Sequence, residues 1–181
     1  MEIDSSSWVF KILLLGDSAV GKTTMIKRFI EKTFKADYKE TLGVNIIRKS
    51  VKVEELNAQV SLIIWDIAGQ ERYEERRKFY YEGCFGALLV YDITRYSSFE
   101  NIEVKWLRHY KESMEKDVPL ILIGNKDDLE DQRFVFQEDA EKMCKKIGAM
   151  RFMETSAKTG HKVNSAFLEL IKAILDQYKS T

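Results

Sequence analysis

The segment that most constrains this chain is a short apolar run, residues 12–15, that leads into a glycine-rich loop and then into a helical pattern. Gly16, Gly21, Lys22 and Thr23 fill every fixed position of the pattern G-x-x-x-x-G-K-[ST]. Backbone N–H groups in such a loop, at the positive end of a helix dipole, offer several donors to an anion. The segment therefore predicts a strand–loop–helix unit that binds phosphate.

Two side chains of this loop have expected chemical roles. Lys22 would reach the β- and γ-phosphates of a nucleotide and stabilise charge on the transferring phosphoryl group, and the Thr23 hydroxyl would coordinate Mg²⁺. The residues expected to contact the nucleotide here are Asp17, Ser18, Ala19, Val20, Gly21, Lys22, Thr23 and Thr24.

The length and net charge of the chain limit the classes of protein to which it can belong. The 181 residues suit one domain spanning 1–181, and 29 basic residues balance 29 acidic ones. A chain without a basic surplus is not expected to have nucleic acid as its main partner. Cys84 and Cys144 form no metal-binding pattern and predict free thiols in a reducing compartment. We therefore expect a cytoplasmic protein.

Membrane attachment has no sequence signal of its own. No apolar run reaches 18 residues, residue 2 is Glu2 rather than the glycine that myristoylation requires, and the final residues contain no cysteine for a prenyl group. Peripheral contact with membranes would therefore not use a lipidation site in this chain.

Short apolar runs alternate with helical patterns along the chain, which predicts an α/β fold with a mostly parallel sheet covered on both faces. Two adjacent runs joined near Asn57 predict an antiparallel hairpin. The expected strands are 9–15, 44–54, 59–66, 86–92, 120–124 and 151–154, and the expected helices are 22–32, 71–82, 99–114, 137–147 and 163–178.

Several polar segments follow strands, and ligands of open α/β sheets bind at the carboxyl ends of the strands. Asp66 ends an apolar run and is expected to hold Mg²⁺ through water. Gly69 is expected to approach the γ-phosphate, and Gln70 to orient the attacking water. Without the phosphate loop, Asp66 and Gly69 would read simply as a strand-end turn. Thr41, in the long loop before residue 44, is expected to coordinate Mg²⁺ while the γ-phosphate is present.

Two further segments suit a purine base. Asn125, Lys126 and Asp128 fit N-K-x-D, in which the last carboxylate accepts two hydrogens from guanine; adenine lacks this donor pair. The alternative is an acidic turn. Another strand is followed by Ser156, Ala157 and Lys158, which would support binding of the base. A turn leading into a helix explains these residues equally well. Other expected nucleotide contacts are Phe34, for which local packing is the alternative, and Tyr38.

Together these residues, in this order, resemble the Ras superfamily of small GTPases, and most closely its Rab-like branch. The likeness to that branch lies in the phosphate loop, in Trp65-Asp-x-Ala-Gly-Gln-Glu-Arg-Tyr and in Tyr80-Tyr-Glu-Gly. The resemblance implies a six-stranded sheet with one antiparallel strand and five helices. It also implies Mg²⁺-dependent binding of GTP and GDP and slow hydrolysis of GTP. Two switch segments, about 34–45 and 69–83, are implied as well.

The resemblance further implies an exchange factor, a GTPase-activating protein and effector proteins that bind the switch segments, with Tyr38 and Tyr73 as contact candidates. The sequence departs from the Rab pattern at Ile67, where Thr is usual, and at Ile46, where an aromatic residue is usual. The terminal cysteines of Rab proteins are absent too. This mixture also fits a divergent relative such as those of archaea.

Two other classes compete with a hydrolysing switch. A scaffold that holds GTP without turning it over is disfavoured by Gln70, Thr41 and Lys22. A nucleotide kinase would need an acceptor domain and an arginine-rich lid, and the chain shows neither. No arginine lies in the phosphate loop or the first switch segment to act within the chain, so we expect a slow intrinsic rate and a separate activating protein.

Overall fold

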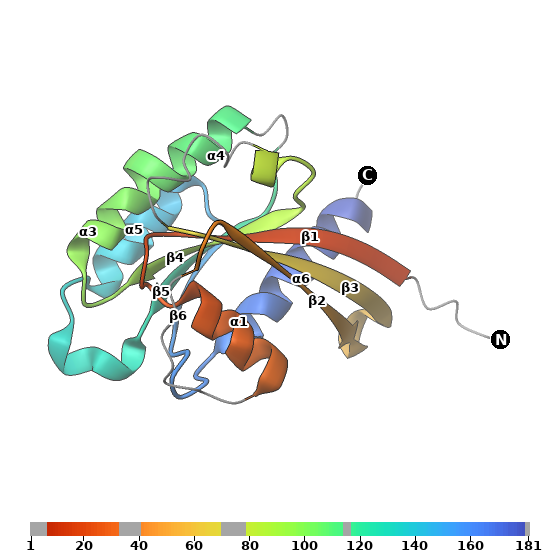
Figure 1. Cartoon of the computed structure of the whole chain (residues 1–181), viewed down its shortest axis with the longest axis horizontal. Helices are drawn as coiled ribbons and strands as arrows, with labels where there is room; N and C mark the ends of the chain where they lie inside the picture. The colour runs from red at the N-terminus through yellow and green to blue at the C-terminus, as the bar shows by residue number, and fades with distance from the viewer. Residues whose placement is uncertain (1–6, 33–40, 70–78, 114–116, 180–181) are drawn as a thin grey trace.

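The computed structural model describes residues 7–32, 41–69, 79–113 and 117–179. Within these residues six strands form one sheet in the order β2-β3-β1-β4-β5-β6 (Figure 1). The β2–β3 pair is antiparallel and every other neighbouring pair is parallel. The strands are β1 (Ser7–Leu15), β2 (Val44–Val53), β3 (Ala58–Ile67), β4 (Gly86–Asp92), β5 (Leu120–Asn125) and β6 (Arg151–Thr155). The predicted sheet is confirmed.

The described helices follow the expected order. One helix runs without a break through α3, η3 and α4, and its middle segment, η3, is π-helical. Residues 79–81 are helical and lie within the predicted helix 71–82, most of which is outside the described residues. The helices are α1 (Lys22–Glu31), α3 (Tyr96–Asn101), η3 (Ile102–Leu107), α4 (Arg108–Ser113), α5 (Gln137–Ile147) and α6 (Val163–Lys179), with short 3-10 turns η1 (Glu54–Leu56) and η4 (Asp127–Gln132). None of the described helices is long and apolar enough to cross a membrane.

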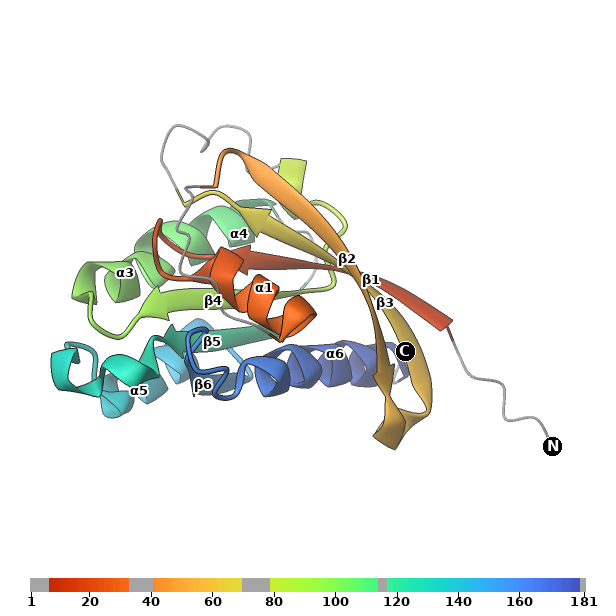
Figure 2. The same cartoon turned by 60° about the horizontal axis from the view of Figure 1, so that its bottom comes forward.

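The helices cover both faces of the sheet, as Figure 2 shows. Helices α1 and α6 lie on one face, where Phe29 and Phe167 stack with their ring centroids 4.1 Å apart. The continuous helix α3–η3–α4 and helix α5 lie on the other, with Trp106, Tyr110 and Cys144 in its core. The structure thus has three layers around two hydrophobic clusters.

Strand β1 has apolar side chains on both faces because it lies in the interior of the sheet. Ile12 and Leu14 belong to the cluster under α1 and α6, whereas Leu13 and Leu15 belong to the cluster under α3–η3–α4. Alternating side chains of a strand point to opposite faces, so a strand covered on both sides needs a continuous apolar run. This requirement explains the run that precedes the phosphate loop.

The predicted hairpin is present as β2 and β3, and its bend lies away from α3 and α5 (Figure 2). The connection is a 3-10 turn, Glu54–Leu56, that ends at Asn57 in the left-handed conformation with φ +45°. Asparagine tolerates this conformation better than most residues. Strand β2 forms one edge of the sheet, and its Arg48, Lys49 and Lys52 suit an edge that must not pair with another chain.

Candidate nucleotide site

The predicted site segments lie at the carboxyl ends of the parallel strands (Figure 2). These ends lie side by side along one edge of the sheet, which is the edge meant below and not the outer strand β2. The phosphate loop follows β1, Asp66 lies near the end of β3, Asn125 ends β5, and Ser156 follows β6. Thr41 precedes β2, whose antiparallel direction places its first residues at the same edge. Segments more than 100 residues apart are therefore brought together by strand order.

The phosphate loop leads into helix α1 through Gly21, the N-cap residue. No side chain among the described residues caps this N-terminus, so these side chains leave its backbone donors to a ligand. Gly21 has φ +101°, and a Cβ atom there would lie 2.3 Å from Nδ2 of Asn125. The side-chain amide of Asn125 donates to the carbonyl oxygen of Val20 at 2.8 Å. Glycine is therefore required both by the backbone conformation and by the close approach of Asn125.

Lys22 is buried within this loop, with 6% of its surface exposed. Its Nζ atom donates to the carbonyl oxygens of Gly16 at 2.6 Å and Asp17 at 2.8 Å. A buried ammonium group needs such acceptors or an anion to balance its desolvation. The cation is thus held across the loop, at the place where the sequence predicts phosphate.

Three predicted Mg²⁺ ligands converge beside the N-terminus of α1. The Thr23 hydroxyl lies 2.8 Å from the Thr41 hydroxyl and donates to Oδ2 of Asp66 at 2.5 Å. Burial raises the pKa of Asp66, and the Thr23 hydrogen bond and the charge of Lys22 oppose that rise. The other carboxylate oxygen, Oδ1, is buried and has no hydrogen-bond partner within the described part of the chain.

These three side chains fit a magnesium ion by their chemistry. Two hydroxyls and one carboxylate are hard oxygen donors, and Mg²⁺ is usually held by one or two carboxylates together with water and substrate phosphates. The buried, unpaired Oδ1 of Asp66 would gain a partner from a cation or from water bound to it.

Gly69 lies against the phosphate loop. A Cβ atom on Gly69 would lie 2.2 Å from the backbone nitrogen of Ser18 and 2.4 Å from the carbonyl carbon of Asp17. Only glycine permits this approach, so the segment after β3 is in direct contact with the loop after β1.

Asn125 connects three parts of the site. Besides its bond to Val20, its Oδ1 atom accepts from the Thr155 hydroxyl at 3.0 Å and from the backbone N–H of Ala157 at 3.2 Å. The backbone N–H of Ala157, a residue predicted to support binding of the base, therefore already has a protein acceptor. Asn125 is 1% exposed and connects the phosphate loop to the two segments that the sequence predicts to bind the base.

Asp128 is positioned by the segment after β6. The Ser156 hydroxyl donates to its Oδ1 atom at 2.6 Å, and Nζ of Lys158 lies 3.9 Å from its Oδ2 atom. Lys126 adopts the left-handed conformation with φ +71°, and its ammonium group pairs with the buried carboxylate of Asp92 at 2.5 Å. The N-K-x-D and Ser-Ala-Lys segments thus form one hydrogen-bonded unit, as their expected joint role requires.

The remaining predicted residues divide into two groups. Ala19, with φ +62°, Val20 and Ser18 lie in the phosphate loop, and Thr24 lies in the first turn of α1. Phe34, Tyr38, Gln70 and Tyr73 lie outside the described residues.

Two arginines that the sequence did not predict donate hydrogen bonds to backbone carbonyl oxygens of the site segments. Arg28, in the last turn of α1, donates from Nε to the carbonyl oxygen of Ala157 at 3.0 Å and from Nη2 to that of Lys158. Arg95 donates from Nη2 to the carbonyl oxygen of Ser18 at 2.6 Å. These partners lie 129, 130 and 77 residues away, and no sequence pattern signals such distant contacts to carbonyl oxygens.

The strand order, the loop after β1 and the converging hydroxyl and carboxylate side chains are those of a P-loop GTPase domain. A family model described as "Ras family" matches residues 11–176. Ras-related protein Rab-13 of Mesocricetus auratus is 44% identical over 167 residues, which cover 92% of this chain and 80% of that protein. Ras-related protein Rab-10 of Diplobatis ommata is 43% identical over 93% of this chain and 82% of its own length. Ras-related protein RABA4b of Arabidopsis thaliana is 43% identical over 92% of this chain and 73% of its own length.

The chain belongs to the Ras family. Within it the chain is Rab-like: it is a small GTP-binding switch protein that works in membrane traffic, and it is a GTP hydrolase. The non-hydrolysing scaffold considered from the sequence is not favoured.

Proposed function

We propose that this GTPase binds GTP and GDP with Mg²⁺ at the sheet edge described above and uses the residues predicted from the sequence. The observation that carries the proposal is the convergence of Thr23, Thr41 and Asp66 next to the buried Lys22, with Oδ1 of Asp66 unpaired. Two hydroxyls, a carboxylate and an ammonium group in one place suit a magnesium–triphosphate.

In this proposal the backbone of the phosphate loop and the Lys22 ammonium group bind the phosphates, and Thr23, Thr41 and Asp66 hold Mg²⁺. The ion, when bound, neutralises charge that develops on the phosphoryl oxygens. Lys22 exchanges its loop acceptors, Gly16 O and Asp17 O, for phosphate oxygens. Gln70 orients the attacking water.

Asp128 is the proposed guanine-reading residue. Ser156 and Lys158 fix its carboxylate, and an adenine base would leave that carboxylate without the donor pair it needs. Ala157 supports the base segment through Asn125. Phe34 and Tyr38 complete the proposed contacts with the nucleotide.

The proposed cycle depends on contacts that the γ-phosphate makes. Thr41 and Gly69 are held while the γ-phosphate is present and released after hydrolysis, so the two switch segments change together. An exchange factor, a GTPase-activating protein and effectors then bind these segments in different nucleotide states. The proposed location is the cytoplasm, with peripheral association at membranes.

The first experiment is the identification, by ion-exchange chromatography, of nucleotide released from the purified, heat-denatured protein. Stoichiometric GDP or GTP is expected, whereas bound adenine nucleotide would contradict the role of Asp128.

Titration of nucleotide-free protein with GDP, IDP and ADP then isolates the base contacts, because IDP lacks only the exocyclic amine of guanine. The affinity for IDP should be about tenfold lower or more, since one charge-assisted hydrogen bond is lost.

The hydrolytic step is tested by Gln70→Leu. This variant should bind GTP as the wild type does and hydrolyse it more slowly, because only the orientation of water is removed. Single-turnover hydrolysis, measured beside the GTP dissociation constant, separates the two effects. An unchanged hydrolysis rate would refute the assigned role of Gln70.

A further inference from the structure

The carboxylate of Asp17, the second residue of the phosphate loop, is held by two donors from one helix. Its Oδ1 atom accepts from the indole Nε1 of Trp106 at 2.8 Å, and its Oδ2 atom accepts from the amide Nδ2 of Asn101 at 2.7 Å. Trp106 is fully buried. We refer to this arrangement, Asp17 with Asn101 and Trp106, as the Asp17 clamp.

A carboxylate in a loop that binds phosphates poses an electrostatic problem. Two negative groups at close range repel each other, and the repulsion grows where water is excluded. The clamp gives each oxygen of Asp17 a donor and directs the carboxylate toward the helix. Hydrogen bonds to an ionised acceptor are stronger than those between neutral groups, so the arrangement holds the side chain firmly.

The backbone next to this side chain contacts the other parts of the site. The carbonyl oxygen of Asp17 accepts from Lys22 at 2.8 Å, and the carbonyl oxygen of Ser18 accepts from Arg95 at 2.6 Å. Gly69 packs against the peptide unit between Asp17 and Ser18. A movement of Asp17 would therefore displace both the phosphate-binding lysine and the glycine that follows β3.

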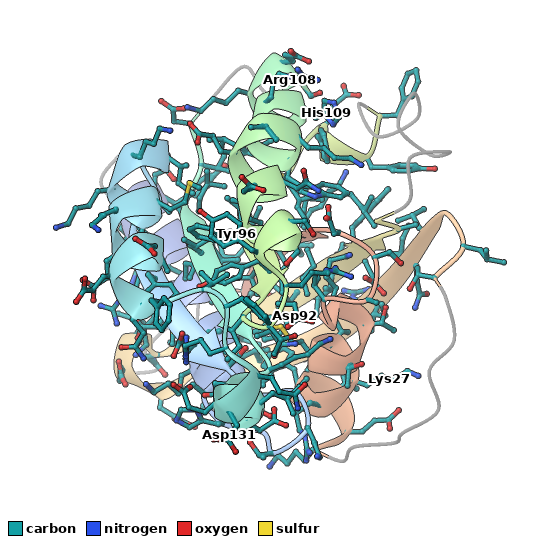
Figure 3. All side chains as sticks on the ribbon, turned by 90° about the vertical axis from the view of Figure 1, so that its left-hand side faces the viewer. Lys27, Asp92, Tyr96, Arg108, His109 and Asp131 are labelled. Atoms are coloured by element: carbon teal, nitrogen blue, oxygen red, sulfur yellow. The ribbon has the colours of Figure 1, made fainter. Side chains whose placement is uncertain are left out.

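The helix that supplies the donors has an uncommon shape at this point. Figure 3 views the molecule with this helix in front; Tyr96 is labelled at its first turn, and Arg108 and His109 farther along. Asn101 and Trp106 are five residues apart, and a regular α-helix would place them about 140° apart around its axis. The π-helical segment Ile102–Leu107 winds more widely, with i→i+5 bonding, and so brings both donors to the same side.

We propose that the Asp17 clamp is a positioning device that sets how long the protein retains its nucleotide, and that the π-helical turn is kept because it aims both donors at Asp17. The inference rests on the proposed nucleotide site. Asn101 and Trp106 act through Asp17, and neither is assigned a contact with the nucleotide.

The test measures the release of a fluorescent GDP analogue from the wild type, Asn101→Ala and Trp106→Phe in Mg²⁺, together with the thermal stability of each. Each variant removes one donor and should release GDP about tenfold faster. Leu107→Ala is the matched control, because it is buried in the same turn but does not contact Asp17. It should lower the melting temperature and change release by less than about twofold. Acceleration in Leu107→Ala equal to that in the clamp variants would overturn the proposal.

Removing the carboxylate itself provides the decisive comparison. Asp17→Ala abolishes both the clamp and the negative charge, so adding Asn101→Ala to it should change release by less than about twofold. The double variant should also release GDP more slowly than Asn101→Ala alone, because no carboxylate is left to turn toward the phosphates. Additive acceleration would overturn the proposal and leave Asn101 a purely structural role.

Deletion of Val104, an exposed residue in the π-helical segment, tests the role of the turn. The shortened helix can be α-helical throughout, with the two donors four residues apart and on one face. Release should remain within about twofold of the wild type, whereas release as fast as in Asn101→Ala would refute the explanation that the turn compensates for the five-residue spacing of the two donors. A wild type that binds no guanine nucleotide would refute the proposed function as well, while a binding wild type with unchanged clamp variants would refute the clamp alone.

Discussion

Gly21 has two independent reasons to be glycine: its φ of +101°, and the Nδ2 atom of Asn125 only 2.3 Å from where a Cβ would lie. Gly21→Ala must either move Asn125 from its bond to Val20 or shift the loop before α1. We expect at least a tenfold loss of GDP affinity, about 1.4 kcal/mol, in a fluorescence titration.

Gly148→Ala is the control for Gly21→Ala. Gly148 has φ +72° at the end of α5, but a Cβ there would meet no atom within 4 Å. The substitution should lower stability by about 1 kcal/mol and leave GDP affinity unchanged. Equal losses of affinity in both variants would mean that backbone strain alone, and not contact with Asn125, explains the effect.

Cys84 carries a testable dependence of stability on pH. Burial raises the pKa of its thiol from 9.0 to about 11. The unfolded chain therefore releases this proton at lower pH than the folded protein, and the free energy of unfolding falls as the pH rises from 9 toward 11. The full effect of such a shift is about 3 kcal/mol.

The measurement is urea unfolding between pH 8 and about 9.5, because the buried Tyr91 and Tyr110, whose ordinary pKa is 10.0, ionise mainly above this range in the unfolded chain. Cys84→Ala should be less stable at every pH, because a buried side chain is truncated, but its stability should decrease less with pH. Cys144→Ala should change the slope of the free energy of unfolding against pH less than Cys84→Ala does. A slope that Cys84→Ala leaves unchanged would assign the dependence to other groups.

At the scale of elements, Arg28 joins helix α1 to the segment that follows β6. Its guanidinium group donates to the carbonyl oxygens of Ala157, Lys158 and Lys32. Since the segment at 156–158 fixes Asp128 and Asn125, loss of Arg28 should loosen the base end of the site. We expect Arg28→Ala to weaken GDP binding by about tenfold and Arg28→Lys to recover only part of it, because lysine cannot reach three acceptors in fixed directions.

The control for Arg28 is Arg151→Ala. Arg151 is an exposed arginine at the opposite end of β6, paired with Glu169 at 3.0 Å. Its removal should not change GDP affinity by more than about twofold, since an exposed ion pair contributes little. If both arginines prove neutral in isothermal titration, the contacts of Arg28 do not support the base segment.

Elements with strong periodicity or fixed motif spacing could be predicted from the sequence. The strand Gly86–Asp92 and the helix Gln137–Ile147 have the predicted bounds, because a buried strand and an amphipathic helix leave clear patterns. The convergence of Thr23 and Asp66 followed from the rule that parallel strands end at one edge. By contrast, Arg28, Arg95 and the clamp on Asp17 act on distant partners, and the π-helical turn shifts register within an otherwise ordinary helical pattern. Local patterns do not encode these features.

At the scale of the whole molecule, the site joins the two covered faces of the sheet. Helix α1, on one face, carries Lys22 and Arg28, whereas the helix α3–η3–α4, on the other, holds Asp17. Asn125 connects the phosphate loop to the segments after β5 and β6. A ligand at the carboxyl ends of the strands would therefore contact segments that are fixed by helices of both layers. Its binding free energy would then stabilise the whole folded domain against unfolding.

This reasoning gives a prediction for the melting temperature of the intact protein. Ligand that binds only the folded state at ~1,000 times its dissociation constant adds about 4 kcal/mol of stability. For a domain of this length each kcal/mol raises the melting temperature by roughly 2–4 °C, so GDP with Mg²⁺ should raise it by roughly 8–16 °C over the nucleotide-free protein.

Chelation of Mg²⁺ should remove part of this increase, because Asp66 would again have a buried oxygen without a partner and the phosphates would lose their counter-ion. Scanning calorimetry of the nucleotide-free protein, with GDP alone and with GDP and Mg²⁺, tests both steps. Asp66→Ala is the matched variant: it should still be stabilised by GDP, yet gain little from adding Mg²⁺. If Mg²⁺ raised its melting temperature as much as that of the wild type, the ion would be held elsewhere, and the convergence of Thr23, Thr41 and Asp66 would need another explanation.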